Sequence, residues 1–219
     1  WRAGLARPAH LVENRRVAFA YCSLGRLDAL MHAKGNDAPE IADLLQWYDE
    51  KIRALLVAAQ RNYADVSWQV FTDHGMHNVV GSHDLMGEIE ALGLRWRHDY
   101  IAFYDSTMAR FWFLNDAARS TITRHLEHHA KGRILSDDEL RAFGVYFENG
   151  QYGELIFLME SGVQIVPSFM GAKPVKGMHG YHPADPDFLA AILSNRPIPA
   201  SITRIQDIHR LMLDGLGPP

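Results

Sequence analysis

Three consecutive residues, Asp73, His74 and Gly75, combine metal-binding side chains with a backbone that can turn sharply. A carboxylate oxygen and an imidazole nitrogen form part of a typical ligand set for zinc or a similar divalent ion. The glycine tolerates the conformations that a tight turn requires. An Asx-type turn with an incidental histidine has the same composition, so the tripeptide alone leaves both interpretations open.

Two further stretches carry side chains of the same kind. Asp28 and His32 are four residues apart, which places them on one face of a helical turn where both can reach one ion. His179 lies between two glycines in a Gly/Pro-rich segment at 171–187, long enough to be a functional loop. Each stretch alone also fits a structural role, as a surface turn with a capping aspartate or as a loop histidine.

Together the three stretches supply two aspartates and three histidines. That is more than one tetrahedral ion needs and slightly fewer than two ions need. Two metal ions about 4 Å apart are a common device for phosphoryl transfer, because they hold the attacking and the leaving oxygen. The combination therefore favours metal-dependent chemistry on a phosphate group.

The elements around these residues indicate how they can meet. Apolar runs at 15–24 and 66–72 are typical of buried strands, and they flank a helix predicted over 39–62 with Asp37 as its N-cap. Strand, helix and strand in this order form a βαβ unit, the building block of a mostly parallel sheet covered by helices. The first two ligand stretches each follow one of these strands, and the carboxyl ends of parallel strands meet at one edge of a sheet.

Further elements are expected downstream. Strands at 99–105 and 108–115 flank a tight turn at Ser106–Thr107. The other expected elements are helices at 83–92, 116–131, 187–194 and 203–214, a helix that begins at a Ser136/Glu139 capping box, and strands at 152–160 and 163–168. No internal repeat and no convincing linker interrupts this succession, so it indicates an α/β chain.

The motifs occur in an order that resembles the alkaline phosphatase superfamily, above all its type I phosphodiesterase/nucleotide pyrophosphatase branch. They are Asp28-x3-His32, "TDHGM" and "GMHGYHP", and the resemblance covers nearly the whole chain. It implies an α/β, alkaline phosphatase-like fold with a central mostly parallel sheet flanked by helices and with the N-terminal part missing. Residues 1–219 would form the C-terminal part of one catalytic domain, with an excursion at about 95–150.

The same resemblance implies a site and an activity. Asp28, His32 and His179 would hold one metal ion, and Asp73 with His74 the second, both of them zinc. The implied reaction is hydrolysis of a small-molecule phosphodiester or nucleotide pyrophosphate by a two-metal mechanism with a covalent Thr or Ser intermediate. Two alternatives stay open: a phosphomonoesterase, sulfatase or phosphonate hydrolase of the same superfamily, and a short non-catalytic metal-binding module.

The family's nucleophile and one further metal-binding aspartate belong to a half that precedes the matched motifs. The chain begins at Trp1 rather than at methionine, so we expect the C-terminal part of a longer enzyme whose nucleophile lies outside this chain. Ser106 and Thr107 come after the matched "TDHGM" motif and fit turn residues better than a nucleophile. The chain alone is therefore expected to be inactive.

Other side chains receive structural or auxiliary interpretations. His125 and His129 have the spacing of a metal-binding pair on a helix, but no further ligand is evident nearby, so a solvated helix face is expected. Arg110 is expected in a structural ion pair. His77 is expected beside the metal site or the substrate. The two lysines that precede His179 are expected to be solvated.

Composition narrows the range of partners. The net charge of −4 gives no electrostatic case for a nucleic-acid patch or for an anionic membrane surface. No apolar run approaches the roughly 18 residues of a membrane span. The one cysteine, Cys22, leaves no possibility of an internal disulfide. A small phosphate ester or nucleotide is the expected partner, while the oligomeric state and the compartment stay open.

Overall fold

The computed structural model describes residues 6–14 and 17–216. These residues form two compact units, each assembled from separate segments. The first unit comprises the residues up to Met31, Asp37–Gly75 and the segment from Ala190 onward, and the second comprises His32–Asn36 and Met76–Leu189. The division passes through one continuous helix, α2 (Arg26–Lys34).

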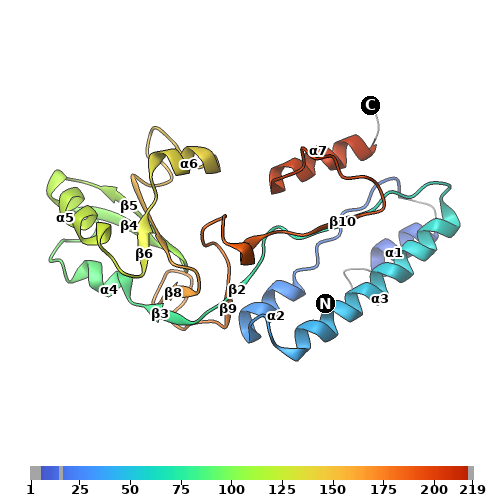
Figure 1. Cartoon of the computed structure of the whole chain (residues 1–219), viewed down its shortest axis with the longest axis horizontal. Helices are drawn as coiled ribbons and strands as arrows, with labels where there is room; N and C mark the ends of the chain where they lie inside the picture. Colours follow the sequence, from blue (N-terminus) through green and yellow to red (C-terminus); the bar gives the residue numbers. More distant parts are fainter. Residues whose placement is uncertain (1–5, 15–16, 217–219) are drawn as a thin grey trace. The chain divides into compact units, whose positions relative to one another are not determined.

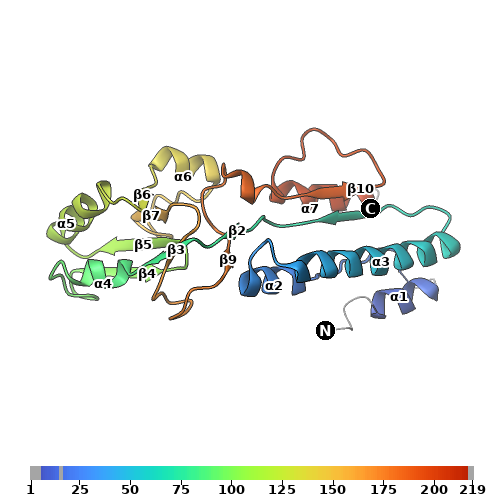
Figure 2. The same ribbon diagram turned by 60° about the horizontal axis from the view of Figure 1, so that its bottom comes forward.

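The first unit consists of helices and one pair of short strands (Figure 1). Its elements are α1 (Ala6–Glu13), the first part of α2, α3 (Pro39–Asn62), β1 (Gln69–Phe71), β10 (Ile192–Ser194) and α7 (Ile205–Leu216). The two strands pair antiparallel, with Val70 opposite Leu193. Figures 1 and 2 both show α1 alongside α3, and these two helices pack against each other.

Helix α3 confirms the strongest periodic pattern in the sequence, since it runs over 39–62 as predicted. Its buried side chains are Ile41, Leu44, Tyr48 and Ala59. The N-cap is Ala38 rather than the expected Asp37, and Pro39 occupies the first turn, where its missing N–H costs no helical hydrogen bond. No helix of the described residues, α3 included, combines the length and the apolar composition needed to cross a membrane.

The strand predicted at 15–24 is wrong for its described part, because residues 17–24 hold no strand. The first two residues of the prediction lie outside the described part of the chain. A buried strand would hide one apolar face, but Phe19 is 50% and Tyr21 is 62% exposed. The ring of Tyr21 instead lies 6.3 Å from that of Phe71 at the end of β1. The strand–helix–strand unit expected around α3 is therefore not formed by the described residues.

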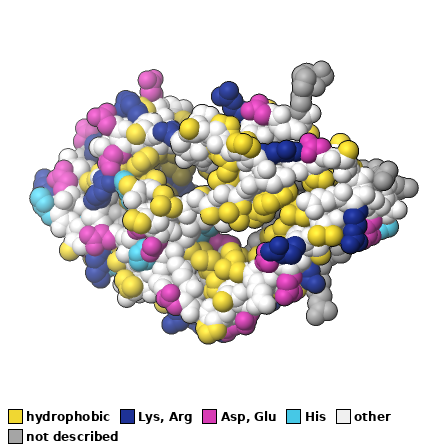
Figure 3. All heavy atoms as spheres, turned by 45° about the vertical axis from the view of Figure 1, so that its right-hand side comes forward, with side chains coloured by type: hydrophobic (Ala, Val, Ile, Leu, Met, Phe, Trp, Pro, Cys, Tyr) yellow, Lys and Arg dark blue, Asp and Glu magenta, His cyan; other side chains and the backbone are white. Residues whose placement is uncertain are grey.

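Apolar side chains of the first unit reach the surface from several elements. Figure 3 shows hydrophobic side chains gathered on the face that it presents. The large exposed ones on α3, β10 and α7 are Leu45, Val57, Leu193, Ile205, Leu213 and Leu216. These helices and this strand therefore bury only part of their apolar residues within the first unit.

The second unit is built on a four-stranded antiparallel sheet with the strand order β4–β5–β7–β6. The strands are β4 (Tyr100–Tyr104), β5 (Met108–Phe113), β6 (Gly132–Ile134) and β7 (Leu155–Met159). A three-residue turn joins β4 to β5 where the tight turn was predicted, and so short a connection forces the two strands to run antiparallel. All five residues of β7 are buried, because β7 pairs with a strand on each side.

Helices α4 (Leu85–Glu90) and α5 (Asp116–Glu127) supply the other half of this core. Core side chains from helices and strands are Leu85, Ile89, Tyr100, Phe111, Ile122, Leu126, Phe157 and Ile165. Helix α6 (Asp137–Phe143) begins at the predicted capping box, in which Ser136 and Glu139 bond each other's backbone N–H groups. It ends at Gly144, in the left-handed conformation that glycine adopts easily.

The central mostly parallel sheet expected from the resemblance is not confirmed. Two short pairs accompany the antiparallel sheet: β2 (His77–Asn78) with β9 (Gly177–Met178), antiparallel, and β3 (Gly81–His83) with β8 (Val163–Ile165), parallel. Among the described strands, β3 and β8 form the only parallel pair. The architecture is therefore mixed α/β with small sheets.

The predicted helix at 187–194 and the predicted excursion at 95–150 have different outcomes. The helix is wrong: a short 3-10 helix, η1 (Pro186–Phe188), precedes the strand β10, which pairs with β1, more than a hundred residues earlier in the chain. Residues 95–150 supply β4, β5, β6, α5 and α6 to the second unit. Their role as an excursion near an active site stays a prediction.

Candidate metal centre

Helix α2 carries the first two predicted ligands, Asp28 and His32, one turn apart on one face. Both side chains are half-buried. Asp28 lies in the first turn, where the partial positive charge of the helix N-terminus favours a carboxylate. Because the two residues belong to one continuous helix, that helix fixes their spacing even though the division between the units crosses it.

The imidazole of His32 is held by the loop that carries the third ligand. Its Nδ1 donates a hydrogen bond to the main-chain oxygen of Gly177 over 2.7 Å. The backbone N–H of Lys176 in turn donates to the main-chain oxygen of His32 over 2.8 Å. Since a carbonyl only accepts, Nδ1 of His32 carries a proton and Nε2 is the nitrogen that can bind an ion, as in a typical metal-binding histidine.

His179 follows β9 directly, and its ring lies 5.0 Å from the ring of His32. The next residue, Gly180, has a φ of +88°, and a Cβ there would lie 2.9 Å from the side-chain oxygen of Thr107. The hydroxyl of Thr107 donates to the main-chain oxygen of Gly180 over 2.8 Å. This turn therefore needs glycine, and it fixes the backbone that presents His179.

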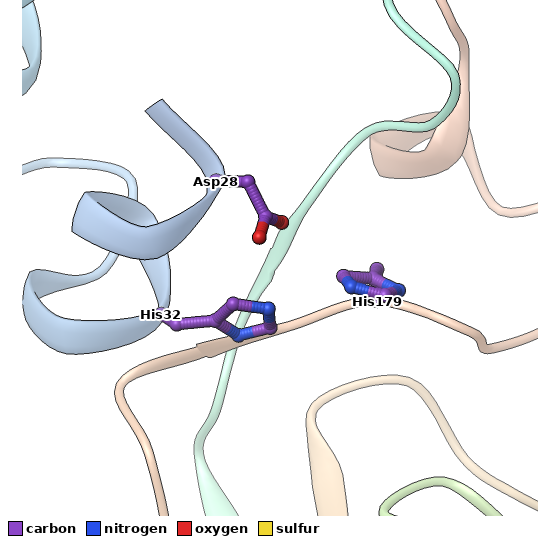
Figure 4. A group of neighbouring side chains, drawn as sticks. All are labelled: Asp28, His32 and His179. Atoms are coloured by element: carbon purple, nitrogen blue, oxygen red, sulfur yellow. The ribbon is translucent and has the colours of Figure 1, made fainter. Parts of the chain in front are cut away.

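Asp28, His32 and His179 each direct one ligand atom to a common point (Figure 4). These three atoms lie within 4.8 Å of one another. Two imidazole nitrogens and one carboxylate oxygen match the three protein ligands of a catalytic zinc site, which keeps a fourth position for water or substrate. The donor set thus fits zinc or a similar divalent ion.

Asp73 and His74 form a separate pair in the first unit, just after β1. His74 donates from Nδ1 to the main-chain oxygen of Gly75 over 2.9 Å. Its Nε2 lies 3.6 Å from a carboxylate oxygen of Asp73, whose side chain is 75% exposed. Within residues 6–14 and 17–216, this pair belongs to no group of three ligands within 4.8 Å. Its role as a second metal site stays a prediction.

Ser106 and Thr107 occupy the turn between β4 and β5, as predicted. Both residues are buried, at 6% and 3% exposure. The backbone N–H of Ser106 bonds to the side chain of Asp105, and the hydroxyl of Thr107 bonds to Gly180. These contacts support the interpretation as structural turn residues.

Arg110 and His77 have contacts of their own, and the expected position of His77 beside the metal site or the substrate stays a prediction. The guanidinium of Arg110 lies over the rings of Phe103 and Tyr152, 4.7 and 4.4 Å from their centroids, and the expected ion pair is not seen among the described residues. His77 approaches Asp187, with 3.5 Å between Nε2 and Oδ2, and the two form a possible ligand group with Asp185. Aromatic residues on neighbouring chain segments thus replace the acidic partner foreseen for the arginine.

The solvated helix face expected for His125 and His129 is wrong. The side chain of His129 is only 7% exposed. Both histidines contact Glu88: His125 Nε2 lies 2.7 Å from Oε1, and His129 Nε2 lies 3.2 Å from Oε2. The sequence showed the spacing of the two histidines, but their acidic partner lies 37 and 41 residues earlier on α4, where no local pattern reveals it.

The chain belongs to the type I phosphodiesterase / nucleotide pyrophosphatase family, whose model matches residues 2–182. This match confirms the resemblance on which the site was predicted. It includes all five predicted ligands, from Asp28 to His179. No curated protein matches the sequence.

Solved structures share the fold at low sequence identity. Human ectonucleotide pyrophosphatase/phosphodiesterase 5 matches with a TM-score of 0.68 and 16% identity, over 88% of this chain and 52% of that chain. Its murine counterpart, an inactive variant in complex with AMP, matches with a TM-score of 0.72 and 18% identity, over 98% and 59%. Phosphonoacetate hydrolase from Sinorhizobium meliloti, in complex with phosphonoacetate, matches with a TM-score of 0.72 and 15% identity, over 98% and 55%.

Identities this low establish a common fold and no more. The shared fold agrees with the predicted α/β class, whereas the central mostly parallel sheet is not confirmed. The chain spans between 52% and 59% of the length of these structural relatives. Activity, substrate and partners of the whole protein are therefore matters for proposal.

Proposed function

We propose that this chain is the metal-binding part of a hydrolase that cleaves phosphodiester or nucleotide pyrophosphate bonds in small molecules. The observation that carries the proposal is the convergence of Asp28, His32 and His179 on one point in a member of the phosphodiesterase family. A helix and a loop almost 150 residues later thus bring three metal-binding side chains together, and the hydrogen bond from His32 to Gly177 joins the two segments.

The proposed centre holds two divalent ions, most simply zinc. Asp28, His32 and His179 would hold the first ion, and Asp73 with His74 would hold the second. Ions in such a centre polarise phosphoryl oxygens and lower the pKa of bound water. The protein's own part is positional: Gly177 fixes the ring of His32, and the Thr107–Gly180 hydrogen bond fixes the loop of His179.

The nucleophile is proposed to lie outside this chain. In the proposed mechanism, a Thr or Ser hydroxyl loses its proton and attacks phosphorus while the P–O bond to the leaving group breaks, and water then cleaves the covalent bond between phosphorus and the Thr or Ser oxygen. Thr107 is a poor candidate, because it is buried and its hydroxyl donates to Gly180. The chain alone is therefore proposed to bind metal without turnover.

A compact phosphorus-containing anion is the proposed substrate. The matched murine structure contains AMP, and the matched bacterial structure contains phosphonoacetate. The first ligand favours a nucleotide and the second a phosphonate, so the phosphonate hydrolase alternative stays open beside the phosphodiesterase. The phosphomonoesterase, sulfatase and non-catalytic alternatives have no such support.

The test is a substrate panel assayed with zinc. Bis(p-nitrophenyl) phosphate, a dinucleotide pyrophosphate, phosphonoacetate, p-nitrophenyl phosphate and p-nitrophenyl sulfate would be offered to the chain and to the product of the complete reading frame. We expect no turnover by the chain, and diester or pyrophosphate cleavage by the complete product. Cleavage of only the phosphonate, the monoester or the sulfate would overturn the proposed substrate class.

Two variants connect the activity to the centre. His179→Ala in the complete product should abolish turnover, whereas His209→Ala, which removes an exposed histidine on α7, should leave it unchanged. Equal activity of the two variants would contradict the proposed centre. Metal-dependent turnover by the 219-residue chain itself would contradict the proposed position of the nucleophile.

A further inference from the structure

A second group of metal-binding side chains lies entirely within the second unit and shares no residue with the motifs that carry the proposed function. We call His83, Glu88, His125 and His129 the histidine–glutamate cluster. Three of its members, His83, Glu88 and His129, each place one ligand atom within 4.8 Å of the other two. No step of the proposed hydrolysis uses any of these residues.

The contacts inside the cluster are short. His129 Nε2 lies 3.1 Å from His83 Nε2 and 3.2 Å from Glu88 Oε2. His83 Nε2 also contacts the same carboxylate oxygen. On the other side of the carboxylate, His125 Nε2 lies 2.7 Å from Oε1. Two imidazole nitrogens and one carboxylate oxygen thus form a small triangle.

Two sides of this triangle match a tetrahedral ion, and the third, between His83 and Glu88, is shorter. A tetrahedral site with bonds of about 2.0–2.1 Å has ligand atoms about 3.3–3.4 Å apart. The two measured separations at His129, 3.1 and 3.2 Å, are close to that edge. The Nε2 atoms of His83 and His129, 3.1 Å apart, cannot both carry a proton, because the two protons would point at one another. A single proton or a metal ion must therefore lie between the two nitrogens.

The surrounding elements hold the cluster in place. His83 ends β3, and its main-chain oxygen accepts a hydrogen bond from Val166 over 3.0 Å. Glu88 lies on α4, and His125 lies on α5, one turn before His129. The ring of His129 meets that of Phe157 edge to face at 5.2 Å. Three rigid elements and the sheet therefore position the ligands before any ion arrives.

The carboxylate of Glu88 contacts all three histidines of the cluster. His125 binds the oxygen that faces away from the triangle, and such a contact orients a metal-binding carboxylate and raises metal affinity.

An ion can also enter. The cluster lines a pocket of about 290 Å³ that is open to the surface, together with His128, Ala130 and Lys131. One contact opposes binding: the backbone N–H of Lys131 donates to His129 Nδ1 over 3.2 Å, which keeps the proton of that ring on Nε2. An ion that binds His129 Nε2 must move this proton to Nδ1, and the hydrogen bond from Lys131 is then lost. Metal binding therefore costs one long hydrogen bond.

We infer that His83, Glu88 and His129 bind a divalent transition ion of the zinc class, with His125 orienting the carboxylate. Two imidazoles among three ligands select such an ion over calcium or magnesium, which prefer oxygen. The ion joins the end of β3, helix α4 and the end of α5, so its role is to stabilise the second unit. The alternative occupant of the triangle is a proton in a metal-free hydrogen-bond network.

The experiment removes the proposed catalytic ligands first. In the variant His32→Ala/His74→Ala/His179→Ala, zinc and cobalt(II) would be titrated by calorimetry and by the visible absorption of tetrahedral cobalt. We expect one equivalent to bind still. Adding His129→Ala should remove this binding, and adding His125→Ala should weaken it about 10–100-fold, as loss of an orienting partner does. Adding His209→Ala, the matched control, should change nothing.

A second measurement does not depend on whether the variants with the added His129→Ala or His125→Ala substitution fold. Nitrogen NMR of the histidine rings in the three-alanine variant would follow Nε2 of each ring during the zinc titration. The inference requires the Nε2 signals of His83 and His129 to move together at one equivalent. Saturation without movement of these signals, or no binding of zinc at one equivalent, would overturn it. Because this variant lacks the three histidines of the proposed catalytic centre, the result does not depend on any hydrolase activity.

Discussion

The Nδ1 of His32 donates to the main-chain oxygen of Gly177, 145 residues further along the chain, over 2.7 Å. A second bond, from the N–H of Lys176 to the main-chain oxygen of His32, runs in the opposite direction. This reciprocal pair joins the last turn of α2 to β9 and sets the ring of His32 beside that of His179. The position of the ligands therefore depends on backbone groups that carry no chemistry themselves.

The first prediction concerns the ligands of this centre. His32→Ala and His179→Ala should each weaken zinc binding by well over 10-fold, because each removes a ligand atom and not merely its orienting partner. The measurement is competition against a chromophoric chelator, with the His129→Ala variant as background so that the histidine–glutamate cluster does not contribute. His209→Ala is the control, and a loss as large as that of His179→Ala in this control would refute the assignment.

The second prediction concerns the turn after His179. Gly180→Ala places a Cβ at a φ of +88° and 2.9 Å from Thr107 Oγ1, so it should destabilise the fold by about 1–3 kcal/mol and weaken zinc binding. Urea denaturation measures the first effect and the chelator competition the second. Gly171→Ala is the matched control, since no atom lies within 4 Å of a Cβ there. If the two alanine variants were equally stable, the turn would not constrain His179.

The third prediction is a pH dependence at the start of α6. Hydrogen bonds from Arg133 first, and from the backbone of Ser136 next, hold the pKa of Glu139 far below its ordinary value of 4.5. A carboxylate with a lowered folded-state pKa stabilises the fold above its ordinary pKa, and this contribution is lost as the pH falls below that value.

The free energy of unfolding of the wild type should therefore exceed that of Glu139→Gln by the largest margin near neutral pH. The margin should shrink steadily as the pH falls from 4.5 towards the lowered pKa. Urea denaturation across this range measures it. Glu127→Gln, at an exposed carboxylate on α5, controls for the loss of one negative charge. A margin that does not change with pH would show that the Arg133 contact contributes nothing.

The local elements were predictable wherever their own side chains decide them. The 3.6-residue period of α3, the capping box of α6 and the short turn between β4 and β5 each depend on neighbours within a few residues. The residues at 17–24 and 192–194 depend on distant partners instead. The first group has a strand-like pattern without becoming a strand, and the second forms β10 only because β1 lies beside it.

The candidate site follows the same division. The spacing of Asp28 and His32 gives their common face directly, because a helix has a fixed period. The contact of His129 with His83 and Glu88 joins a helix end to a strand end and to another helix, at separations of 46 and 41 residues. Spacing along the chain carries no information about such a meeting, so the sequence predicted a solvated face where the structure has a half-buried cluster.

The last prediction concerns the pair Asp73 and His74, which has no third ligand among the described residues. Asp73 and His74 offer one oxygen and one nitrogen, and Asp73 is largely exposed, so zinc should bind there more weakly than at Asp28, His32 and His179. Calorimetric titration of the His129→Ala variant should show a tight event followed by a weak one. Adding His74→Ala should remove only the weak event, and adding His179→Ala only the tight one. Loss of the tight event with His74→Ala would instead show that both groups hold a single ion.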